Sequence, residues 1–319
     1  MEQLVYLEAV LRHGSFRAAS RILGVSQPTL SDQIRKLEED LDVVLLLRSR
    51  SGVIPTPAVE ILRPYFARLI EDERVVRAES KALSSLHSGE IRVGTTSMLA
   101  KVLVTPVVTT YRASHPNVKF DVNEVGSELI VERVLNWDLD FGLIAEISDE
   151  STDEALVSKP LLINPLVVCF PRGDSHAGIK HVTFSELAKE SWITQGHAYT
   201  LRRVLDKISK PSSPNIAYVA QSTGAALQMV AAGVGISLSV PLALATINQE
   251  DRARIIAVPL TGRGIPNIVS ALVRRKDALP SRASAEFMRL ILHLIETSEP
   301  IQHLRISQPI TRRPPLGKQ

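Results

Sequence analysis

The sequence contains a single cysteine and no long hydrophobic run. Cys169 has no second cysteine to pair with, so no disulfide forms within the chain and no oxidising compartment is required. The longest apolar runs, such as Val43–Leu47 and Leu166–Phe170, hold about five residues, far short of the roughly 20 that span a bilayer. No basic region of the kind that opens a secretory signal follows Met1. We therefore expect a soluble, cytoplasmic protein without membrane contact.

An excess of charge of either sign is also missing from most of the chain. The 319 residues carry 37 lysines and arginines against 34 aspartates and glutamates, a formal net charge of +3. The last twenty residues alone contribute +4, from Arg305, Arg312, Arg313 and Lys318. Charge therefore argues neither for nor against nucleic acid binding. Because 45% of the residues are hydrophobic, the chain can build two or three domains with buried cores, which excludes a disordered or collagen-like protein.

Residues 4–41 are typical of three successive helices. Ser15 and Ser26 are suited to cap the second and third helices, and Gly24 is suited to end the second in a left-handed conformation. Pro28 falls in the first turn of the third helix, where its missing N–H does no harm. One face of that helix is apolar, at Leu30, Ile34, Leu37 and Leu41. Two helices joined by a short turn predict a helix-turn-helix, and residues 45–54 predict a hairpin, or wing, after it.

A long helix is expected to begin at Pro57, with Thr56 as its N-cap and a kink at Pro64. Its apolar residues recur at near-heptad spacing, interrupted by the polar Glu73 and Ser80: they are Leu62, Phe66, Leu69, Val76 and Leu83. This spacing indicates a coiled-coil helix that forms a dimer, and a helix packed within its own chain is the alternative. Residues 84–89 predict a hinge.

Strands alternate with helices beyond Gly89. The strands are expected at residues 91–94, 118–122, 139–144, 166–170, 192–194, 216–219 and 234–239, and the helices at about 98–113, 127–136, 183–189, 200–208 and 223–232. Alternation of this kind predicts parallel α/β sheets, and two sets of such elements predict two lobes.

The order of these residues resembles that of a known family. The N-terminal pattern consists of Gly14-Ser15-Phe16, Ala18-Ala19, Leu23, Val25–Ser31, Gln33-Ile34, Leu37-Glu38 and Leu41. It resembles the winged helix-turn-helix of LysR-type transcriptional regulators. The effector-binding domain of the same family is resembled by Ile91–Gly94, His115-Pro116, Leu139–Ile144 and Val230–Ser237. The resemblance covers about residues 2–297.

The resemblance implies a multidomain protein of mixed α+β and α/β class. Residues 1–57 would form the winged helix-turn-helix, and residues 58–88 the linker or dimerisation helix and hinge. Residues 89–299 would form a two-lobed α/β effector-binding domain like the type 2 periplasmic-binding proteins. Its lobe I would span 89–160 and 268–299, and its lobe II 161–267. Residues 300–319 are expected to be a disordered basic tail.

The resemblance also implies a function. A dimer of the helix-turn-helix domain would bind double-stranded DNA at an interrupted inverted repeat, because the operator mirrors the two-fold symmetry of the protein. The effector domains would pair again, giving a homotetramer as a dimer of dimers. A small-molecule effector between the lobes would shift the balance between two tetramer shapes. RNA polymerase becomes a partner if the protein activates transcription. The effector, the target genes and the choice between activation and repression stay open.

Several positions depart from the family pattern. The family usually has Gly at the position of Asp42, Phe at that of Leu46 and Gly at that of Val59. Pro64 is not typical of the linker helix, and a basic residue often stands where this chain has Asp32. These departures leave the expected fold intact but bear on the wing and on the DNA sequence preference.

The first turns of the third helix are expected to face base edges in the major groove. The candidates there are Gln27 and Ser31 for reading bases, and Pro28 and Thr29 for apolar contact with a thymine methyl group. Asp32 would repel phosphate but could accept a hydrogen bond from cytosine N4; an ion pair with Lys36 is the alternative. The candidate phosphate contacts are Arg17, Arg21, Arg35, Arg48 and Arg50.

Ligands of open α/β lobes bind beyond the carboxyl ends of the strands, where helix N-termini present free N–H groups. The candidates are Thr95, Thr96, Ser97 and Ser127 from lobe I, and Gln195, His197, Arg202 and Thr223 from lobe II. The resemblance places the effector contacts of the family in the same loops. Helix capping is the alternative for residues 95–97, and a solvent-exposed histidine is the alternative for His197. Hydroxyls, N–H groups and one or two arginines suit a small carboxylate.

Catalytic motifs are missing from the sequence: it has no nucleophile elbow, zinc-protease motif, P-loop or cysteine pair at metal-ligand spacing. Gly233-Val234-Gly235 lacks the third glycine of a dinucleotide fingerprint and predicts a helix end and turn. Cys169 lies in an apolar strand and predicts a buried structural thiol. We expect no enzymatic activity, no metal and no cofactor. Two rival classes are an enzyme that carries a helix-turn-helix module and a solute-binding carrier.

Overall fold

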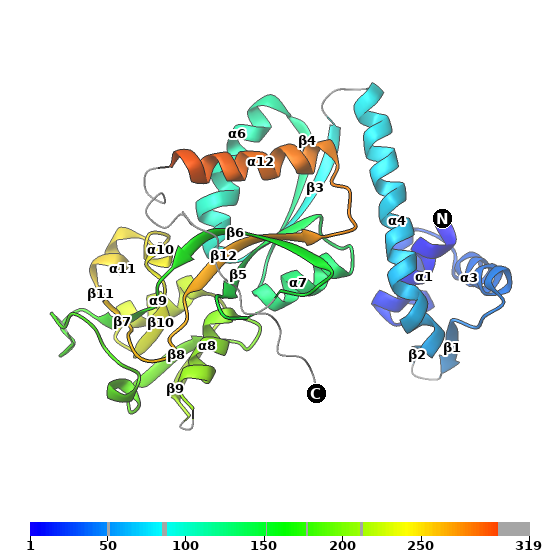
Figure 1. Cartoon of the computed structure of the whole chain (residues 1–319). Coiled ribbons are helices and arrows are strands. Elements are labelled where there is room, and N and C mark those ends of the chain that lie inside the picture. Colours follow the sequence, from blue (N-terminus) through cyan, green and yellow to red (C-terminus); the bar gives the residue numbers. More distant parts are fainter. Residues whose placement is uncertain (50–51, 85–87, 151, 177, 211–212, 299–319) are drawn as a thin grey trace. The chain divides into compact units, whose positions relative to one another are not determined.

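The computed structural model describes residues 1–49, 52–84, 88–150, 152–176, 178–210 and 213–298 (Figure 1). The chain divides into two compact units, Met1–Leu86 and His87–Gln319. Three expectations fall on residues that the structure does not describe: the tail at 300–319, Arg50 of the wing and residues 85–87 of the hinge.

The N-terminal unit consists of α1 (Glu2–His13), α2 (Phe16–Leu23), α3 (Gln27–Leu41), β1 (Leu46–Ser49), β2 (Gly52–Pro55) and α4 (Pro57–Ser84). The expected caps are confirmed: Ser15 accepts a hydrogen bond from the amide of Ala18, and Ser26 accepts one from the amide of Thr29. Gly24 ends α2 with φ +68°. β1 and β2 pair antiparallel, as expected of a wing. Local side-chain chemistry therefore fixes the helix-turn-helix.

The departures from the family pattern are accommodated within this unit. Its apolar core draws on all three helices, the hairpin and α4, and includes Leu7, Val10, Leu30, Ile34, Leu46, Val59 and Phe66. Leu46 and Val59 are both buried there, so the two substituted positions serve the core. Asp42 ends α3 with φ +51°, in the left-handed region that favours glycine. Asp42 therefore adopts the left-handed conformation at the end of α3 that a glycine would adopt at lower energetic cost.

Helix α4 packs on the core of its own unit along its first half, and its pairing with a second chain stays a prediction. The helix continues through Pro64, and its Phe66 is buried in the core of the N-terminal unit. Arg63 donates to Glu8 over 2.8 Å and so ties α4 to α1. Leu69 and Val76 are 50% and 67% exposed. The first half of α4 therefore packs within its own chain, and an apolar stripe further along it faces solvent.

Lobe I of the C-terminal unit is a five-stranded sheet in the order β4-β3-β5-β12-β6. Its strands are β3 (Ser88–Thr95), β4 (Asn117–Glu124), β5 (Phe141–Ile147), β6 (Leu156–Asn164) and β12 (Ile268–Arg275). β3 runs parallel to β4 and β5, whereas β12 runs antiparallel to β5 and β6. β3 already includes Ser88 and Gly89, so the hinge expected at 84–89 is wrong at those two residues.

Lobe II is a second five-stranded sheet in the order β11-β7-β10-β8-β9. Its strands are β7 (Val167–Pro171), β8 (Ser191–Gln195), β9 (Asn215–Ala220), β10 (Ile236–Ser239) and β11 (Ile255–Pro259). β7 runs antiparallel to β10 and β11. The expectation of wholly parallel sheets is therefore wrong, and both sheets are mixed. The cause is connectivity: the chain enters lobe II through β7 and returns to lobe I through β12, without the crossover helix that a parallel neighbour needs.

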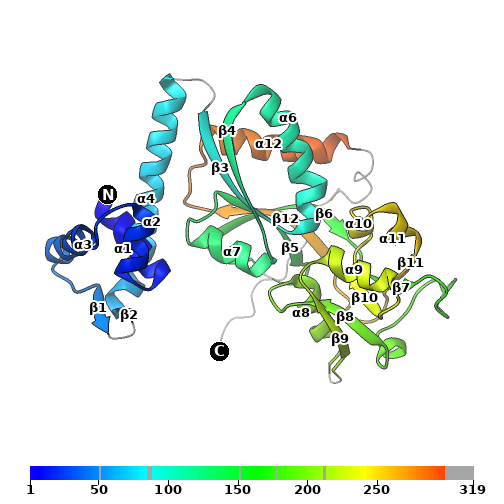
Figure 2. The ribbon, with the colours of Figure 1, turned by 180° about the vertical axis from the view of Figure 1, so that it is seen from behind.

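Helices cover both faces of the lobe I sheet. α6 (Thr105–Ser114) and α12 (Arg282–Thr297) lie on one face and α7 (Ser127–Leu135) lies on the other (Figures 1 and 2). Before α6 come α5 (Ser97–Leu99) and a π-helical turn, η1 (Ala100–Val104). The wider turn accommodates Pro106, which cannot donate to a helical carbonyl.

Lobe II carries α8 (Thr200–Ile208), α9 (Thr223–Ala231), α10 (Pro241–Leu244) and α11 (Gln249–Ala253). The helix expected at 183–189 is only a short 3₁₀ turn, η2 (Ser185–Leu187). α12, β6, β11 and β12 were not expected from the sequence.

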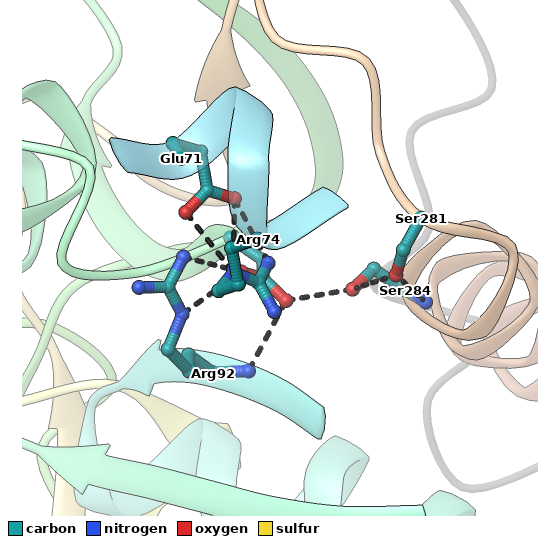
Figure 3. A network of polar contacts seen from close by, with 6 residues as sticks. Glu71, Arg74, Arg92, Ser281 and Ser284 are labelled. Atoms are coloured by element: carbon teal, nitrogen blue, oxygen red, sulfur yellow. Dashed lines mark hydrogen bonds and ion pairs between the residues drawn. The ribbon is translucent and has the colours of Figure 1, made fainter. Parts of the chain in front are cut away.

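A buried carboxylate joins three elements of lobe I. Arg92 of β3 donates to Asp140 Oδ1 through Nε and Nη2, at 3.1 and 2.9 Å. Ser284 donates to Asp140 Oδ2 at 2.7 Å, and Ser281 caps α12 at the amide of Ser284. Figure 3 labels Arg92, Ser281 and Ser284 of this network. Asp140 thus precedes β5 as an anchor, although it was expected inside the strand.

Candidate functional site

The first turns of α3 present polar side chains to solvent. Gln27, Pro28, Thr29 and Asp32 are exposed, and Ser31 is half-buried. The hydroxyl groups of Ser26 and Thr29 lie 2.7 Å apart at the start of the helix. The opposite face of α3, with Leu30 and Ile34, is buried in the core of the unit. The fold therefore leaves Gln27, Pro28, Thr29 and Asp32 at the surface of the unit.

Asp32 faces an arginine on the same helix. Its Oδ1 lies 3.9 Å from Arg35 Nη2, rather than against Lys36 as the alternative expectation had it. Nη1 of the same guanidinium contacts Glu39 Oε1 at 2.5 Å. Arg35 therefore lies between two carboxylates on the exposed side of α3.

Among the other charged groups of this unit, one glutamate holds two backbone amides and two arginines are exposed. Glu38 accepts hydrogen bonds from the amides of Leu45 and Leu46, at 2.7 and 3.0 Å, and so ties α3 to the wing. Arg17 and Arg21 are exposed on α2. Arg48 lies in β1 opposite Val53. Glu38 therefore stabilises the fold, whereas Arg17 and Arg21 are available at the surface.

A cavity of about 40 Å³ lies between the two lobes. Its lining consists of Thr96, Ser97, Met98, Ser127, Ala145 and Ile268 from lobe I, and Gln195, Tyr199, Thr200, Leu201, Thr223 and Val240 from lobe II. We call this cavity the cleft. Met98, Leu201, Val240 and Ile268 supply most of its apolar wall. Every one of these twelve side chains is uncharged.

Four helices begin at the cleft. Ser97, Ser127, Thr200 and Thr223 are the first residues of α5, α7, α8 and α9, and all four line the cavity. The first N–H groups of a helix have no partner inside the helix, and this end of the helix carries partial positive charge. The cleft therefore offers positive electrostatic potential from backbone dipoles in place of charged side chains.

Two buried polar atoms at the cleft have no hydrogen-bond partner. They are Thr96 Oγ1, from lobe I, and Gln195 Nε2, from lobe II. The Gln195 side chain is only 1% exposed. Leaving a buried donor unpaired costs about 1–3 kcal/mol. Each of these atoms can donate a hydrogen bond to a molecule in the cleft.

Three candidate residues are placed away from the cleft. The hydroxyl of Thr95 donates to the carbonyl of Thr96, so it serves the local backbone. Arg202 donates through Nε to both oxygens of Asp206 at 2.9 Å. His197 is 78% exposed, and its Nδ1 lies 3.4 Å from Asp206 Oδ2. Asp206, one helical turn after Arg202 in α8, therefore pairs with both basic groups that were expected to contact a ligand.

Close contacts join the lobes beside the cleft. Thr200 Oγ1 donates to the carbonyl of Ala145 at 2.7 Å. A Cβ at Gly126 would lie 2.5 Å from the carbonyl oxygen of Ala198, so the two backbones approach as closely as glycine allows. Gly126 is therefore needed for the lobes to approach this closely.

Ion pairs run along the same side. Arg203 pairs with Glu128, at 3.4 Å, and with Glu150, and Lys207 pairs with Asp149 at 3.0 Å. We call these five residues the interlobe clasp. No local pattern predicts this clasp, because its acids and bases lie more than fifty residues apart in the chain.

Cys169 is fully buried in β7 of lobe II. Burial raises the pKa of its thiol to about 12, despite the opposing charge of Arg252. The thiolate is the reactive form of cysteine, so this side chain is chemically inert at neutral pH. The expectation of a structural thiol is confirmed.

Two family models match the chain. Residues 1–60 match the bacterial regulatory helix-turn-helix protein of the lysR family, and residues 84–295 match the LysR substrate binding domain. This chain belongs to the LysR family. It is a LysR-type transcriptional regulator with an effector-binding domain, and its homologues are transcriptional regulators.

Curated relatives of this LysR-type regulator cover most of its length. The HTH-type regulator YbhD of Escherichia coli is 27% identical over 88% of this chain and 87% of its own length. YybE of Bacillus subtilis is 27% identical over 74% and 81%. The dual regulator OxyR of Escherichia coli is 26% identical over 79% and 82%.

Solved structures share the fold. Full-length OxyR from Pseudomonas aeruginosa has a TM-score of 0.69 at 20% identity, covering 96% of this chain and 97% of its own. CbnR in complex with its target DNA has a TM-score of 0.58 at 22% identity, covering 92% and 98%. Among the described residues of this regulator, no helix is long and apolar enough to cross a membrane.

Proposed function

We propose that this LysR-type regulator binds an interrupted inverted-repeat operator and responds to a small carboxylate in the cleft. The observation that carries the effector part is the convergence of four helix N-termini on one cavity that also holds two unpartnered buried donors. Such a site stabilises an anion without a basic side chain. The helix-turn-helix, with its exposed α3, carries the DNA part.

Residues 1–57 form the domain that binds the operator. Gln27, Ser31 and Asp32 read base edges, while Pro28 and Thr29 make apolar contacts. Phosphates are contacted by Arg17, Arg21, Arg48 and Arg50, whereas Arg35 lies beside Asp32 on α3. Residues 58–88 link two DNA-binding domains, and the exposed Leu69 and Val76 supply apolar surface that packs against a second chain. Pairing of the effector domains then gives a dimer of dimers, and RNA polymerase is a partner if the output is activation.

In the effector part, the carboxylate accepts hydrogen bonds from Thr96 Oγ1 and Gln195 Nε2 and from first-turn amides. The apolar body of the effector packs on Met98, Leu201 and Val240. Ser97, Ser127 and Thr223 supply further hydroxyl groups. Thr95, His197 and Arg202 then act on the structure around the cleft and not on the effector itself, because the structure turns them to other partners.

Effector binding changes the balance between lobe arrangements. Because Thr96 and Gln195 come from different lobes, a ligand that bonds both favours the arrangement in which they are close. A ligand shifts such an equilibrium by its difference in affinity for the two states. The tetramer that results bends the operator differently, which changes transcription.

Relatives of this chain include a hydrogen peroxide-inducible genes activator of Pectobacterium carotovorum, 26% identical over 79% of this chain. Oxidation of a thiol requires an accessible thiolate. Cys169 is the one cysteine of the chain, is fully buried and has a pKa raised to about 12. The chemistry of this thiol favours a small-molecule effector over thiol-based peroxide sensing.

The effector proposal is tested by mass spectrometry of molecules that copurify with the full chain. We expect a small carboxylic acid, and its readdition to stripped protein should raise the unfolding temperature. A Gln195→Leu variant should lose both the copurifying acid and the thermal shift. Copurification of an amine or a dinucleotide, or an unchanged shift in the variant, would contradict the proposal.

A further inference from the structure

An acidic side chain stands among the residues of α3 that face solvent. The Asp32 side chain is 66% exposed and lies one helical turn after Pro28. Residues three and four apart share a helix face, so Pro28, Asp32 and Arg35 project from the same side. In a helix-turn-helix this side enters the major groove. Asp32 would therefore lie among base edges.

A carboxylate in the major groove has few favourable partners. It is repelled by the phosphates and accepts hydrogen bonds without donating any. The amino groups that donate there are N4 of cytosine and N6 of adenine. Adenine N6 lies between two acceptors, its own N7 and the O4 of thymine, which repel a carboxylate, whereas cytosine N4 has an acceptor on one side only, the O6 of guanine. Cytosine is therefore the base that suits Asp32.

The neighbouring arginine fits the other half of the same base pair. Arg35 Nη2 lies 3.9 Å from Asp32 Oδ1, so the two side chains reach toward a common region. Guanine presents N7 and O6, the acceptors that arginine binds in a bidentate manner. Glu39 holds Nη1 of the guanidinium at 2.5 Å and limits how far Arg35 can swing. A carboxylate and a guanidinium at this spacing match the donor of cytosine and the acceptors of guanine.

We propose that Asp32 is a specificity-determining residue that accepts a hydrogen bond from cytosine N4, with Arg35 reading guanine in the same or the adjacent base pair. Each operator half-site then contains a C·G pair at the position that faces Asp32. This inference rests on the proposed operator binding and adds the identity of one base. It also gives a physical role to an acid at a position that is often basic in the family.

The test is a selection of bound sequences from a pool of random double-stranded DNA, with the full chain. The wild type should select a cytosine at one fixed position of each half-site. Asp32→Asn should select adenine there, because an amide both donates to N7 and accepts from N6. Asp40→Asn, an exposed acid near the other end of α3, is the matched control and should select the same sequences as the wild type.

Titrations on the selected operator give the size of the effect. Replacing the C·G pair by T·A should weaken wild-type binding by about 5- to 150-fold, the range for one good base contact. The same replacement should change the binding of Asp32→Ala by less than about 2-fold. The inference is overturned if Asp32→Asn selects the wild-type bases and binds all sequences uniformly more tightly, as removal of a solvated acid would. If no sequence is enriched by the wild type, the proposed operator binding itself has failed.

Discussion

The hydroxyl of Thr200 donates a hydrogen bond of 2.7 Å to the carbonyl oxygen of Ala145. Thr200 opens α8 of lobe II and Ala145 lies in β5 of lobe I, so this bond joins the lobes where both residues line the cleft. The lobes are therefore connected directly beside the proposed effector. Loss of this hydrogen bond should affect the structure of both lobes.

Thr200→Val removes this bond while keeping the shape of the side chain. The variant leaves the carbonyl of Ala145 without its partner, which should lower the free energy of unfolding by about 0.5–1.5 kcal/mol. Amides of α8 should exchange with solvent faster in hydrogen-exchange measurements. Thr110→Val is the control, since its hydroxyl donates to Pro106 in its own helix. Equal effects of the two variants on α8 would contradict the proposed role.

Gln195→Leu replaces an unpartnered buried donor by an apolar side chain of similar size. Because Nε2 has no hydrogen-bond partner within the protein, the variant should be more stable than the wild type by up to about 1–3 kcal/mol in urea unfolding. It should at the same time lose the effector, since function and stability oppose each other at such a site. A variant that is less stable than the wild type would show that Gln195 serves the fold.

Removal of the interlobe clasp should have an effect that depends on salt. Arg203 and Lys207 are partly exposed, and an exposed ion pair contributes at most about 1 kcal/mol. A double alanine variant at these positions should be less stable at low ionic strength, and the difference should shrink at about 0.5 M salt. Arg254→Ala is the control: it breaks the ion pair with Glu250 at the end of α11 and shows how much stability is lost when an exposed pair outside the clasp is removed. A difference that is the same at both salt concentrations would exclude an electrostatic clasp.

Cys169 should make stability depend on pH in the alkaline range. Its pKa is raised from 9.0 to about 12 by burial, so the folded protein keeps the proton that the unfolded chain loses above pH 9. The stability that the protonated thiol contributes is therefore fully present below pH 9 and is lost as the pH rises toward 12. Cys169→Ala should remove this part of the pH dependence in urea unfolding. A wild-type thiol that reacts with a labelling reagent at pH 8 would contradict its inertness.

Asp42→Gly should stabilise the N-terminal unit. Asp42 has φ +51°, where a side chain costs about 1 kcal/mol relative to glycine. Urea unfolding should show a gain of about 0.5–1 kcal/mol for Asp42→Gly. Asp40→Gly, inside the last turn of α3, should lose stability instead. A loss in both variants would mean that the carboxylate of Asp42 contributes more than its backbone costs.

Local features of the fold were predictable from the sequence, and long-range ones were not. The caps at Ser15 and Ser26 and the turn at Gly24 depend on neighbours in the chain, and each forms as expected. The antiparallel position of β12 depends on a strand that returns from lobe II, which no local pattern encodes.

Some residues of the cleft were likewise predictable from the sequence, and others were not. Thr96, Ser127 and Gln195 line the cavity as their places after strands predicted. Arg202 and His197 do not, because Asp206 on the next turn of α8 attracts both. Side-chain pairing of this kind depends on where helical residues point, which spacing alone does not give.

The central claim is tested most directly by binding of the full chain to the DNA next to its own gene, measured by fluorescence anisotropy at increasing salt. We predict tight binding to this fragment, weaker binding to a scrambled fragment of the same length, and a steep loss of affinity with salt as phosphate contacts release counterions. Equal affinity for the two fragments, or no binding at low salt, would contradict operator recognition by this chain.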